Sequence, residues 1–235
     1  MIELSKRMQA VADMVTPGLS VTDIGCDHGF VSIYLMQQNI ATGVIAMDVN
    51  EGPLKIAKSH IEEYGLSEYI ETRLSDGLSA INPMEAESMV CAGMGGRLMI
   101  RILTDEIEKA RGMKEIILQP QSELGYVRRS LLELGFQIVD ENILCEEGKY
   151  YVVMKVFPGN EAEYTQYAKD DISLEFGTVL LQKKHPVLKE YLNKMESQYS
   201  IILSQIPLDN EKSVQDRQNM EHKLNQVKKA LELLE

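Results

Sequence analysis

The sequence predicts an α/β protein whose mostly parallel sheet carries helices on both faces, followed by a C-terminal helical hairpin. Five short apolar runs alternate with stretches of helical periodicity before residue 136, the pattern of a parallel sheet with right-handed crossovers. Acids and glycines stand where several of these runs end, notably at Asp23, Asp48 and Asp76. After about residue 187 the periodicity is purely helical.

Turn-forming residues separate the first elements. Pro17 and Gly18 end the first helix, Pro53 begins the third, and Gly65 closes it in the C′ position. The expected elements, in order, are helix 5–15, strand 20–25, helix 31–38, strand 42–48, helix 54–64 and strand 70–74.

The next elements continue the alternation and then change to an antiparallel pair. A strand over 88–92 leads into glycine-rich residues and a helix over 97–110, and a fifth strand covers 115–120. Ser122 is expected to cap the following helix, which Gly135 closes. The segments 136–148 and 149–157 are expected to pair across a short Gly148-Lys149 turn, which adds antiparallel strands at one edge.

The sequence predicts a boundary at Pro158-Gly159-Asn160, which divides the chain into residues 1–159 and 160–235. Two helices, 187–206 and 211–234, are expected to lie antiparallel around Pro207. This hairpin is either a packing or dimerisation arm or an arm that grips a substrate. The second helix carries an apolar stripe of Met220, Leu224, Val227, Leu231 and Leu234.

Composition narrows the class of protein. No run approaches the roughly 20 apolar residues that span a membrane, and the first residues lack a signal-peptide core, so we expect a cytoplasmic protein without membrane attachment. The three cysteines are widely spaced and form no CxxC pair, which argues against disulfides and against a metal site. The net charge of −12 means that any polyanion must meet a local basic patch.

The turn at 23–29 (DIGCDHG) predicts the ligand. A strand that enters a helix through Gly25 and Gly29 directs free backbone N–H groups at one point. The dinucleotide fingerprint G-x-G-x-x-G would require a glycine where Asp27 stands, and a carboxylate there disfavours a pyrophosphate. It favours a cation such as S-adenosylmethionine, whose ammonium Asp23 and Asp27 are placed to bind.

Two further acids fit the rest of this ligand. Asp48 follows Gly25 by 23 residues, the spacing at which an acid binds ribose hydroxyls. Asp76-Gly77 is placed to bind the adenine. The alternatives are a solvated turn aspartate at Asp48 and a simple strand-end turn at Asp76.

The motifs DIGCDHG, AMDVN, SDGL, AGMGG and ILQPQ, followed by the helical hairpin, resemble those of bacterial tRNA (adenine(22)-N(1))-methyltransferases over essentially the whole chain. The resemblance implies a seven-stranded Rossmann-like sheet, S-adenosylmethionine as cofactor and adenine 22, in the D-loop region of tRNA, as substrate. It makes residues 1–159 the catalytic domain and 160–235 a tRNA-gripping arm.

The resemblance also assigns site residues. The cofactor would contact Asp23, Gly25, Asp27, His28, Gly29, Asp48, Asn50, Asp76, Gly77, Gly93 and Met94. The substrate would contact Arg7, Gly95, Gly96, Arg97, Gln119, Pro120 and Gln121. Asp27 is the catalytic candidate, with a role as cofactor ligand alone as the alternative; His28 either contacts the transfer site or is a satisfied turn histidine.

The residues after the fourth strand bear on the target atom. Enzymes that methylate the adenine amine often carry a polar-Pro-Pro-aromatic motif there, whereas this chain has Ala92-Gly93-Met94-Gly95. Ring nitrogen 1 holds an in-plane lone pair and attacks a methyl group without a base, so positioning and desolvation supply most of the catalysis.

Eight cations are candidates for phosphate contacts: Lys6, Arg7, Arg97, Arg101, Arg128, Arg129, Lys183 and Lys184. A solvated charged face is the alternative. Rival functions are another RNA methyltransferase, an NAD-dependent oxidoreductase, which Asp27 disfavours, and a catalytically silent binding module. A monomer is favoured.

Overall fold

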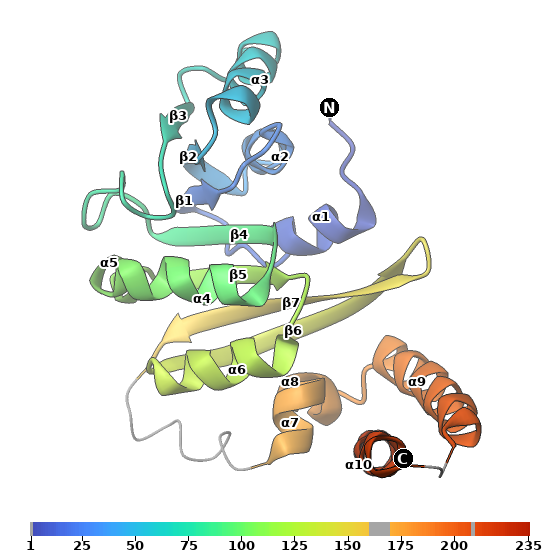
Figure 1. Cartoon of the computed structure of the whole chain (residues 1–235). Coiled ribbons are helices and arrows are strands. Elements are labelled where there is room, and N and C mark those ends of the chain that lie inside the picture. Colours follow the sequence, from blue (N-terminus) through green and yellow to red (C-terminus); the bar gives the residue numbers. More distant parts are fainter. Residues whose placement is uncertain (1, 160–169, 208–209) are drawn as a thin grey trace.

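The computed structural model describes residues 2–159, 170–207 and 210–235, which form a seven-stranded sheet flanked by helices (Figure 1). The strand order is β3-β2-β1-β4-β5-β7-β6. Strands β1 to β5 are parallel, and β7 and β6 complete the sheet in antiparallel pairing. The strands are β1 (Leu19–Ile24), β2 (Ala41–Asp48), β3 (Ile70–Leu74), β4 (Ser88–Met94), β5 (Glu115–Pro120), β6 (Phe136–Glu146) and β7 (Lys149–Pro158).

The helices divide between the two faces of the sheet. They are α1 (Lys6–Ala12), α2 (Phe30–Gln37), α3 (Glu51–Glu63), α4 (Gly96–Asp105), α5 (Ile107–Arg111), α6 (Leu124–Glu133), α7 (Asp171–Phe176), α8 (Thr178–Gln182), α9 (Pro186–Gln205) and α10 (Glu211–Leu233). Helices α1 to α3 enclose one hydrophobic core, and α4 to α10 enclose the other. Both faces of the parallel strands are therefore covered, as such strands require.

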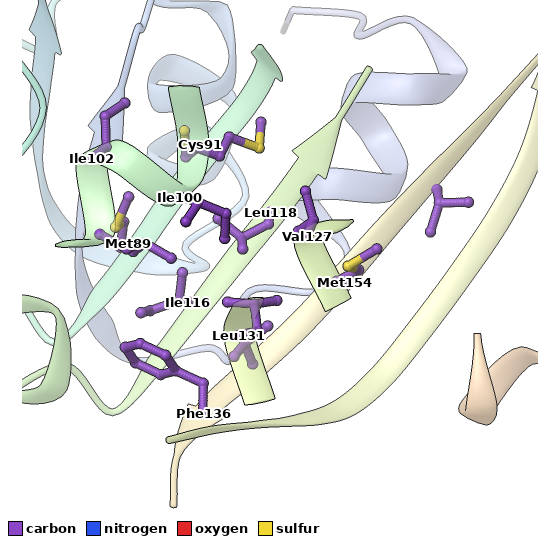
Figure 2. Packing of buried hydrophobic residues seen from close by; sticks show 14 of the residues in the cluster. Met89, Cys91, Ile100, Ile102, Ile116, Leu118, Val127, Leu131, Phe136 and Met154 are labelled. Carbon is purple, nitrogen blue, oxygen red and sulfur yellow. The ribbon is translucent and has the colours of Figure 1, made fainter. Parts of the chain in front are cut away.

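The two cores follow the period-two alternation of the strands. On β4, Met89 and Cys91 belong to the core beneath α4 and α6, whereas Val90 belongs to the core beneath α1 and α2. Figure 2 shows side chains of β4 and β5 meeting those of α4 and α6, with Phe136 at the end of the cluster. This packing holds the ends of the central strands in fixed relative positions.

The predicted strands and most predicted helices are confirmed, with local differences. The first helix, expected over 5–15, is α1, which already ends at Ala12. Helix α3 begins at Glu51, two residues before Pro53, because the first-turn N–H that proline lacks has no helical acceptor. The expected helix 97–110 is two helices, α4 and α5, separated at Glu106 (φ −130°, ψ 48°). The hairpin turn is Glu147-Gly148, both at positive φ, and not Gly148-Lys149.

Ser122 does not cap α6 as expected. The N-cap position belongs to Glu123 in a left-handed conformation (φ 56°), with no side-chain capping bond. The Ser122 hydroxyl instead accepts a hydrogen bond from the Gly96 N–H at 3.3 Å. Ser122 thus connects the start of α4 to the loop after β5, a long-range role that local capping rules do not predict.

The C-terminal helices pack on the same core as the sheet. Helices α7 and α8, which the sequence pattern did not predict, bury Leu174, Phe176 and Leu180. On α10 the predicted apolar stripe is largely buried, and Val227 belongs to the cluster that includes the central strands. Asn160, part of the expected domain boundary, lies outside the described residues.

A buried ion pair joins these helices to the sheet. The side chains of Arg128 on α6 and Glu141 on β6 are 2% and 1% exposed, and the Arg128 Nε donates to Glu141 at 2.8 Å. Arg128 Nη1 also donates to the carbonyls of Leu174 and Glu175 on α7, at 2.9 and 2.7 Å. Arg128 is therefore not available for phosphates, contrary to expectation, because its charge neutralises Glu141 inside the protein.

Most of the other candidate cations are paired with carboxylates on the protein surface. Of the other cations expected to contact phosphate, Arg97, Arg101, Arg129 and Lys183 form ion pairs with protein carboxylates. Cys26 and Cys91 are buried free thiols, while Cys145 is half-buried. Within residues 2–159, 170–207 and 210–235, no helix is long and apolar enough to cross a membrane.

We predict that Arg128→Ala lowers the free energy of unfolding by about 3–5 kcal/mol, because it leaves the Glu141 carboxylate buried without a partner. The neighbouring exposed pair of Arg129 and Asp171 is a matched control, and Arg129→Ala should cost less than about 1 kcal/mol. Urea unfolding followed by circular dichroism measures both. Equal losses in the two variants would contradict a structural role for the buried pair.

Candidate active site

The candidate site lies where the strand order reverses. Strands β1 and β4 are neighbours, and the chain proceeds from β1 toward one edge and from β4 toward the other. In such sheets a crevice forms at the carboxyl ends of these strands. Here the carboxyl ends of β1 to β4 surround a cavity of about 440 Å³, with α1 and α4 contributing to its walls.

The turn after β1 forms one wall of the cavity. Gly25, Asp27 and Gly29 all have positive φ (71°, 50° and 75°), so the backbone reverses tightly before α2. The N–H groups of Gly25 and Cys26 donate to the Met47 carbonyl at 2.8 and 2.9 Å, which fixes the turn against β2. The Asp27 side chain is 72% exposed at the cavity wall.

Asp23 lies beneath this turn and not in the cavity wall. Its side chain accepts a hydrogen bond from the Ser32 hydroxyl at 2.7 Å, which connects β1 to α2. Burial raises the pKa of Asp23 from 3.8 to about 6; the Ser32 hydrogen bonds lower it and the nearby Asp48 carboxylate raises it further. A cation bound above the turn would favour the charged form of Asp23.

The ends of β2 and β3 supply acids to the opposite side. Asp48 is nearly buried, and its Oδ1 accepts the Asn50 N–H at 2.8 Å, which orients the carboxylate at the cavity. Val49 beside it is 59% exposed and also lines the cavity. The Asp76 Oδ1 accepts a bond from Arg101 Nη2 at 2.9 Å, so one oxygen of this expected adenine ligand is already engaged.

A buried glutamine on β5 fixes the end of β4 by hydrogen bonds. The Gln119 Oε1 accepts both the Gly93 N–H at 3.2 Å and Arg7 Nη1 at 3.1 Å, and the residue is fully buried. The guanidinium of Arg7 also lies over the Tyr151 ring, 5.4 Å from its centroid. Gln119 therefore positions Arg7 from α1 beside Gly93, and exposed Gln121 completes this side of the cavity.

Glycines at the site permit close packing. A Cβ on Gly25 would lie 2.1 Å from the Met94 Cε, so the Met94 side chain covers the glycine turn. A Cβ on Gly96 would lie 2.6 Å from the Ser122 carbonyl oxygen, which explains this glycine by the packing of α4.

The structure brings most of the expected residues together. Ten of them line the cavity: Arg7, Gly25, Asp27, Asp48, Asn50, Asp76, Gly77, Gly93, Met94 and Gln121. Eight do not: Asp23, His28, Gly29, Gly95, Gly96, Arg97, Gln119 and Pro120.

Two of those eight have other partners, although the His28 Nε2 also lies 3.4 Å from the Asp27 Oδ1 at the cavity wall. His28 stacks in an aromatic group with Phe30 and His60, at centroid distances of 5.8 and 6.0 Å. Arg97 pairs with Glu123 at 2.7 Å and lies over the Tyr126 ring.

The cavity also contains residues that the sequence pattern missed as site residues. They are Met8, Ile24, Val49, Ser75, Ala92, Leu98, Arg101 and Ile102. Val49 and Ser75 directly adjoin predicted acids, and Leu98 and Ile102 lie four residues apart on one face of α4. The sequence could therefore have indicated these four as site residues. The sequence gives no such indication for Met8, because nothing in the local pattern places α1 at the carboxyl edge of the sheet.

This donor set fits S-adenosylmethionine. The volume of the cavity falls within the range of small-molecule sites, and its lining combines apolar side chains with a few polar groups. Carboxylates from three strand ends match an ammonium, a ribose diol and an adenine amine, and none of these contacts requires a metal. Among the residues described, no cluster of histidine, cysteine and acidic side chains could hold a metal ion.

Comparisons with known proteins agree with this geometry. A family model described as a methyltransferase domain matches residues 4–154, so the chain is a methyltransferase of the Rossmann-like class. The tRNA (adenine(22)-N(1))-methyltransferase of Bacillus subtilis is 34% identical over 238 residues, covering 99% of this chain and 96% of the relative. The chain belongs to the tRNA (adenine(22)-N(1))-methyltransferase family.

Solved structures share the whole fold. The B. subtilis m1A22 tRNA methyltransferase TrmK superposes with a TM-score of 0.86 at 29% identity, covering 98% of this chain and all of that one. Streptococcus pneumoniae Sp1610 in complex with S-adenosyl-L-methionine gives a TM-score of 0.85 at 32% identity, covering 97% of this chain and 100% of that one. The seven-stranded sheet and the C-terminal helices are therefore both features of the family fold.

The raised pKa of Asp23 predicts how stability depends on pH. The folded protein holds this proton more tightly than the unfolded chain, so the stabilisation it gives is complete below pH 3.8 and lost as pH rises through about 6. Asp23→Asn has no carboxyl group to titrate, so the unfolding free energy of the variant should not contain this loss of stability with rising pH. We expect the unfolding free energy of the variant to gain roughly 1–3 kcal/mol on the wild type between about pH 4 and about pH 7.

Urea unfolding without cofactor, at several pH values, tests this expectation. The exposed Asp216→Asn is the control and should follow the wild type throughout. A constant difference between Asp23→Asn and wild type would show that burial does not raise this pKa.

Proposed function

We propose that the protein transfers the methyl group of S-adenosylmethionine to ring nitrogen 1 of adenine 22 in tRNA. The observation that carries the proposal is the composition of the cavity. Carboxylates from three strand ends line one part of it, and Arg7 and Gln121 flank Gly93 in another part. The carboxylates can bind the polar groups of the cofactor, and the side chains of Arg7 and Gln121 can form hydrogen bonds with a base. The named activity of the B. subtilis relative supplies the nucleotide position.

The cofactor would be held by the strand ends in order. Asp27, with Asp23 beneath it, faces the methionine ammonium; Asp48 and Asn50 face the ribose; and Asp76 and Gly77 face the adenine. Asp48 is already oriented by the Asn50 N–H, so little reorganisation is needed on binding. Once bound, the cofactor supplies an electrophilic methyl group on its sulfonium.

The protein's part in the reaction is to place and desolvate the base. Nitrogen 1 carries a lone pair and no proton, so attack requires alignment and exclusion of water and no general base. Arg7 and Gln121 stand beside the opening to orient the base, and Gln119 acts through Arg7 as a positioning residue. Asp27 is exposed at the wall and is placed to stabilise the cationic product.

Methylation of the exocyclic amine is the second candidate, and the β4 exit disfavours it. Gly93 and Met94 occupy the place where amine-directed enzymes carry polar-Pro-Pro-aromatic residues. The buried Gln119 amide is engaged with Arg7, Gly93 and the Pro120 carbonyl, so it does not bind an amine in the cavity. Gln121 is the remaining glutamine for base contact.

The C-terminal residues 160–235 are proposed to help hold the tRNA, with residues 1–159 performing the chemistry. The division is one of roles, since α7 and α10 share the hydrophobic core of the sheet. Among the described residues, the candidates for phosphate contact whose side chains form no ion pair with a carboxylate are Lys6, Arg7 and Lys184; the Lys6 backbone N–H donates to Glu146. We propose that the protein acts as a monomer in the cytoplasm.

Asp48→Ala should weaken binding of S-adenosylhomocysteine by roughly ten- to a hundredfold, because charge-assisted hydrogen bonds to the ribose are lost. Isothermal titration calorimetry measures this directly, and NAD should give no heat with the wild type. Binding of NAD alone would contradict the proposed cofactor.

Gln121→Ala is the matched comparison at the other side of the cavity. It should lower turnover on tRNA and leave affinity for S-adenosylhomocysteine within about twofold, because its partner is the base and not the cofactor. Equal losses of turnover and cofactor affinity would place Gln121 in the cofactor site.

Incubation with S-adenosylmethionine and tRNA that contains an unmodified adenine 22 should yield 1-methyladenosine. Nucleoside mass spectrometry with authentic standards separates this product from its amine-methylated isomer by retention time. A tRNA with guanine at position 22 is the control and should remain unmodified. Amine-methylated adenosine or methylated guanosine as the main product would refute the assignment of the target atom.

A further inference from the structure

A second hollow adjoins the cofactor cavity. It has a volume of about 440 Å³ and lies over β7, between the start of α6 and helix α9. Gln121 lines both hollows, so the groove begins where the proposed target base would enter. In Figure 1 the long β6–β7 hairpin extends past the ends of the parallel strands, and α9 lies along the same side.

The lining of this groove is aromatic and apolar. Ile143 and Val152 are buried in its floor, and half-buried Leu124 stands at one side. Tyr150 of β7 and Tyr191 of α9 form the far wall, with ring centroids 4.8 Å apart and planes tilted by 44°. Aromatic rings beside an apolar floor are the kind of surface on which unpaired bases stack in single-stranded nucleic-acid sites.

Cations accompany the rings although the chain as a whole carries a net charge of −12. Lys149 lines the groove, and the Lys194 ammonium lies 5.2 Å from the Tyr150 ring centroid. Two acids also lie near this wall: Glu190 accepts the Tyr150 hydroxyl at 2.7 Å and thereby raises the pKa of Tyr150 to about 12, and burial, together with the charge of Glu175, raises the pKa of Tyr191. Lys149 and Lys194 are placed to meet phosphates.

We infer that this groove binds a nucleotide adjoining the target adenine, with its base stacked against Tyr150 and its phosphate near Lys149. The inference rests on the proposed function, because the target base is what places a neighbouring nucleotide at Gln121. It adds a site for a flanking nucleotide, so that the enzyme holds two consecutive bases apart. Such a site selects an unpaired segment of RNA over a continuous duplex.

Three variants test the groove in direct binding of tRNA. Tyr150→Ala removes the ring and should weaken tRNA binding by roughly five- to a hundredfold, the range for loss of one stacked aromatic ring. Leu124→Trp fills the groove and should weaken tRNA binding similarly. Tyr150→Phe keeps the ring and should bind like the wild type. Affinity for S-adenosylhomocysteine should be unchanged in all three, because none of these side chains lines the cofactor cavity.

The controls separate stacking from a structural role. Tyr69→Ala removes a 53% exposed ring near the opposite edge of the sheet and should not change tRNA affinity. A loss in Tyr150→Ala with normal binding by Leu124→Trp would show that the ring acts only by supporting α9, and would overturn the inference. So would a loss in Tyr150→Phe equal to that in Tyr150→Ala, because the Glu190 bond would then be responsible.

The chain contains no tryptophan, so Tyr150→Trp provides a unique fluorescent reporter in the groove. Its emission should be quenched by tRNA and unchanged when protein concentration rises without RNA. Quenching by protein concentration alone would assign the groove to a second copy and overturn the inference. Wild type that binds tRNA but yields no methyladenosine refutes the proposed function; wild type that methylates while Tyr150→Ala behaves identically refutes the groove alone.

Discussion

The reversal of strand order between β1 and β4 is the constraint on which the site depends. Hydrogen bonds pair β1 with β2 on one side and with β4 on the other, so their carboxyl ends cannot be covered by one crossover helix. The resulting crevice receives the Gly25 turn, Asp48 and Gly93 from three separate strands. Each lies at or beside a strand end, so the parallel pairing of β2, β1 and β4 brings all three to one edge of the sheet. Gly93 stands at an irregularity in the pairing of β4 with β5, between Ala92 and Met94.

The antiparallel hairpin gives this common arrangement its particular surroundings. Because β7 inserts between β5 and β6, the hairpin lies beside the carboxyl end of β5 and carries Tyr150 and Tyr151 toward the site. Arg128 and Glu141 then fasten α7 to the same edge from inside the protein. Helix α7 is consequently held against the β6 edge of the sheet by a buried charge pair as well as by apolar packing.

The sequence predicted those parts of the structure that depend on local pattern. Strand periodicity located every strand, and the acids Asp48 and Asp76 could be placed because strand ends coincide with breaks in the apolar pattern. Arg128 could not be placed, since nothing in its neighbourhood on α6 distinguishes it from exposed Arg129. Its burial depends on Glu141 and on carbonyls more than forty residues away.

The same reasoning explains the errors at the site. Gln119 lies near the end of an apolar strand and was expected to face the base, yet its amide oxygen accepts hydrogen bonds from Arg7 of α1 and from the Gly93 N–H. Short helices such as α7 and α8 carry too few residues to show a periodic stripe. In each case the structure depends on contacts with residues distant in the sequence, which local propensity does not predict.

The unequal environments of the three thiols make the protein suited to site-specific labelling without engineering. Burial raises the pKa of Cys26, and it raises the pKa of Cys91 to about 12, so neither forms an accessible thiolate at neutral pH. Cys145 is half-buried and pairs with Tyr150 across the β6–β7 ladder. A maleimide dye would therefore attach at Cys145, where its emission would report directly on events in the neighbouring groove.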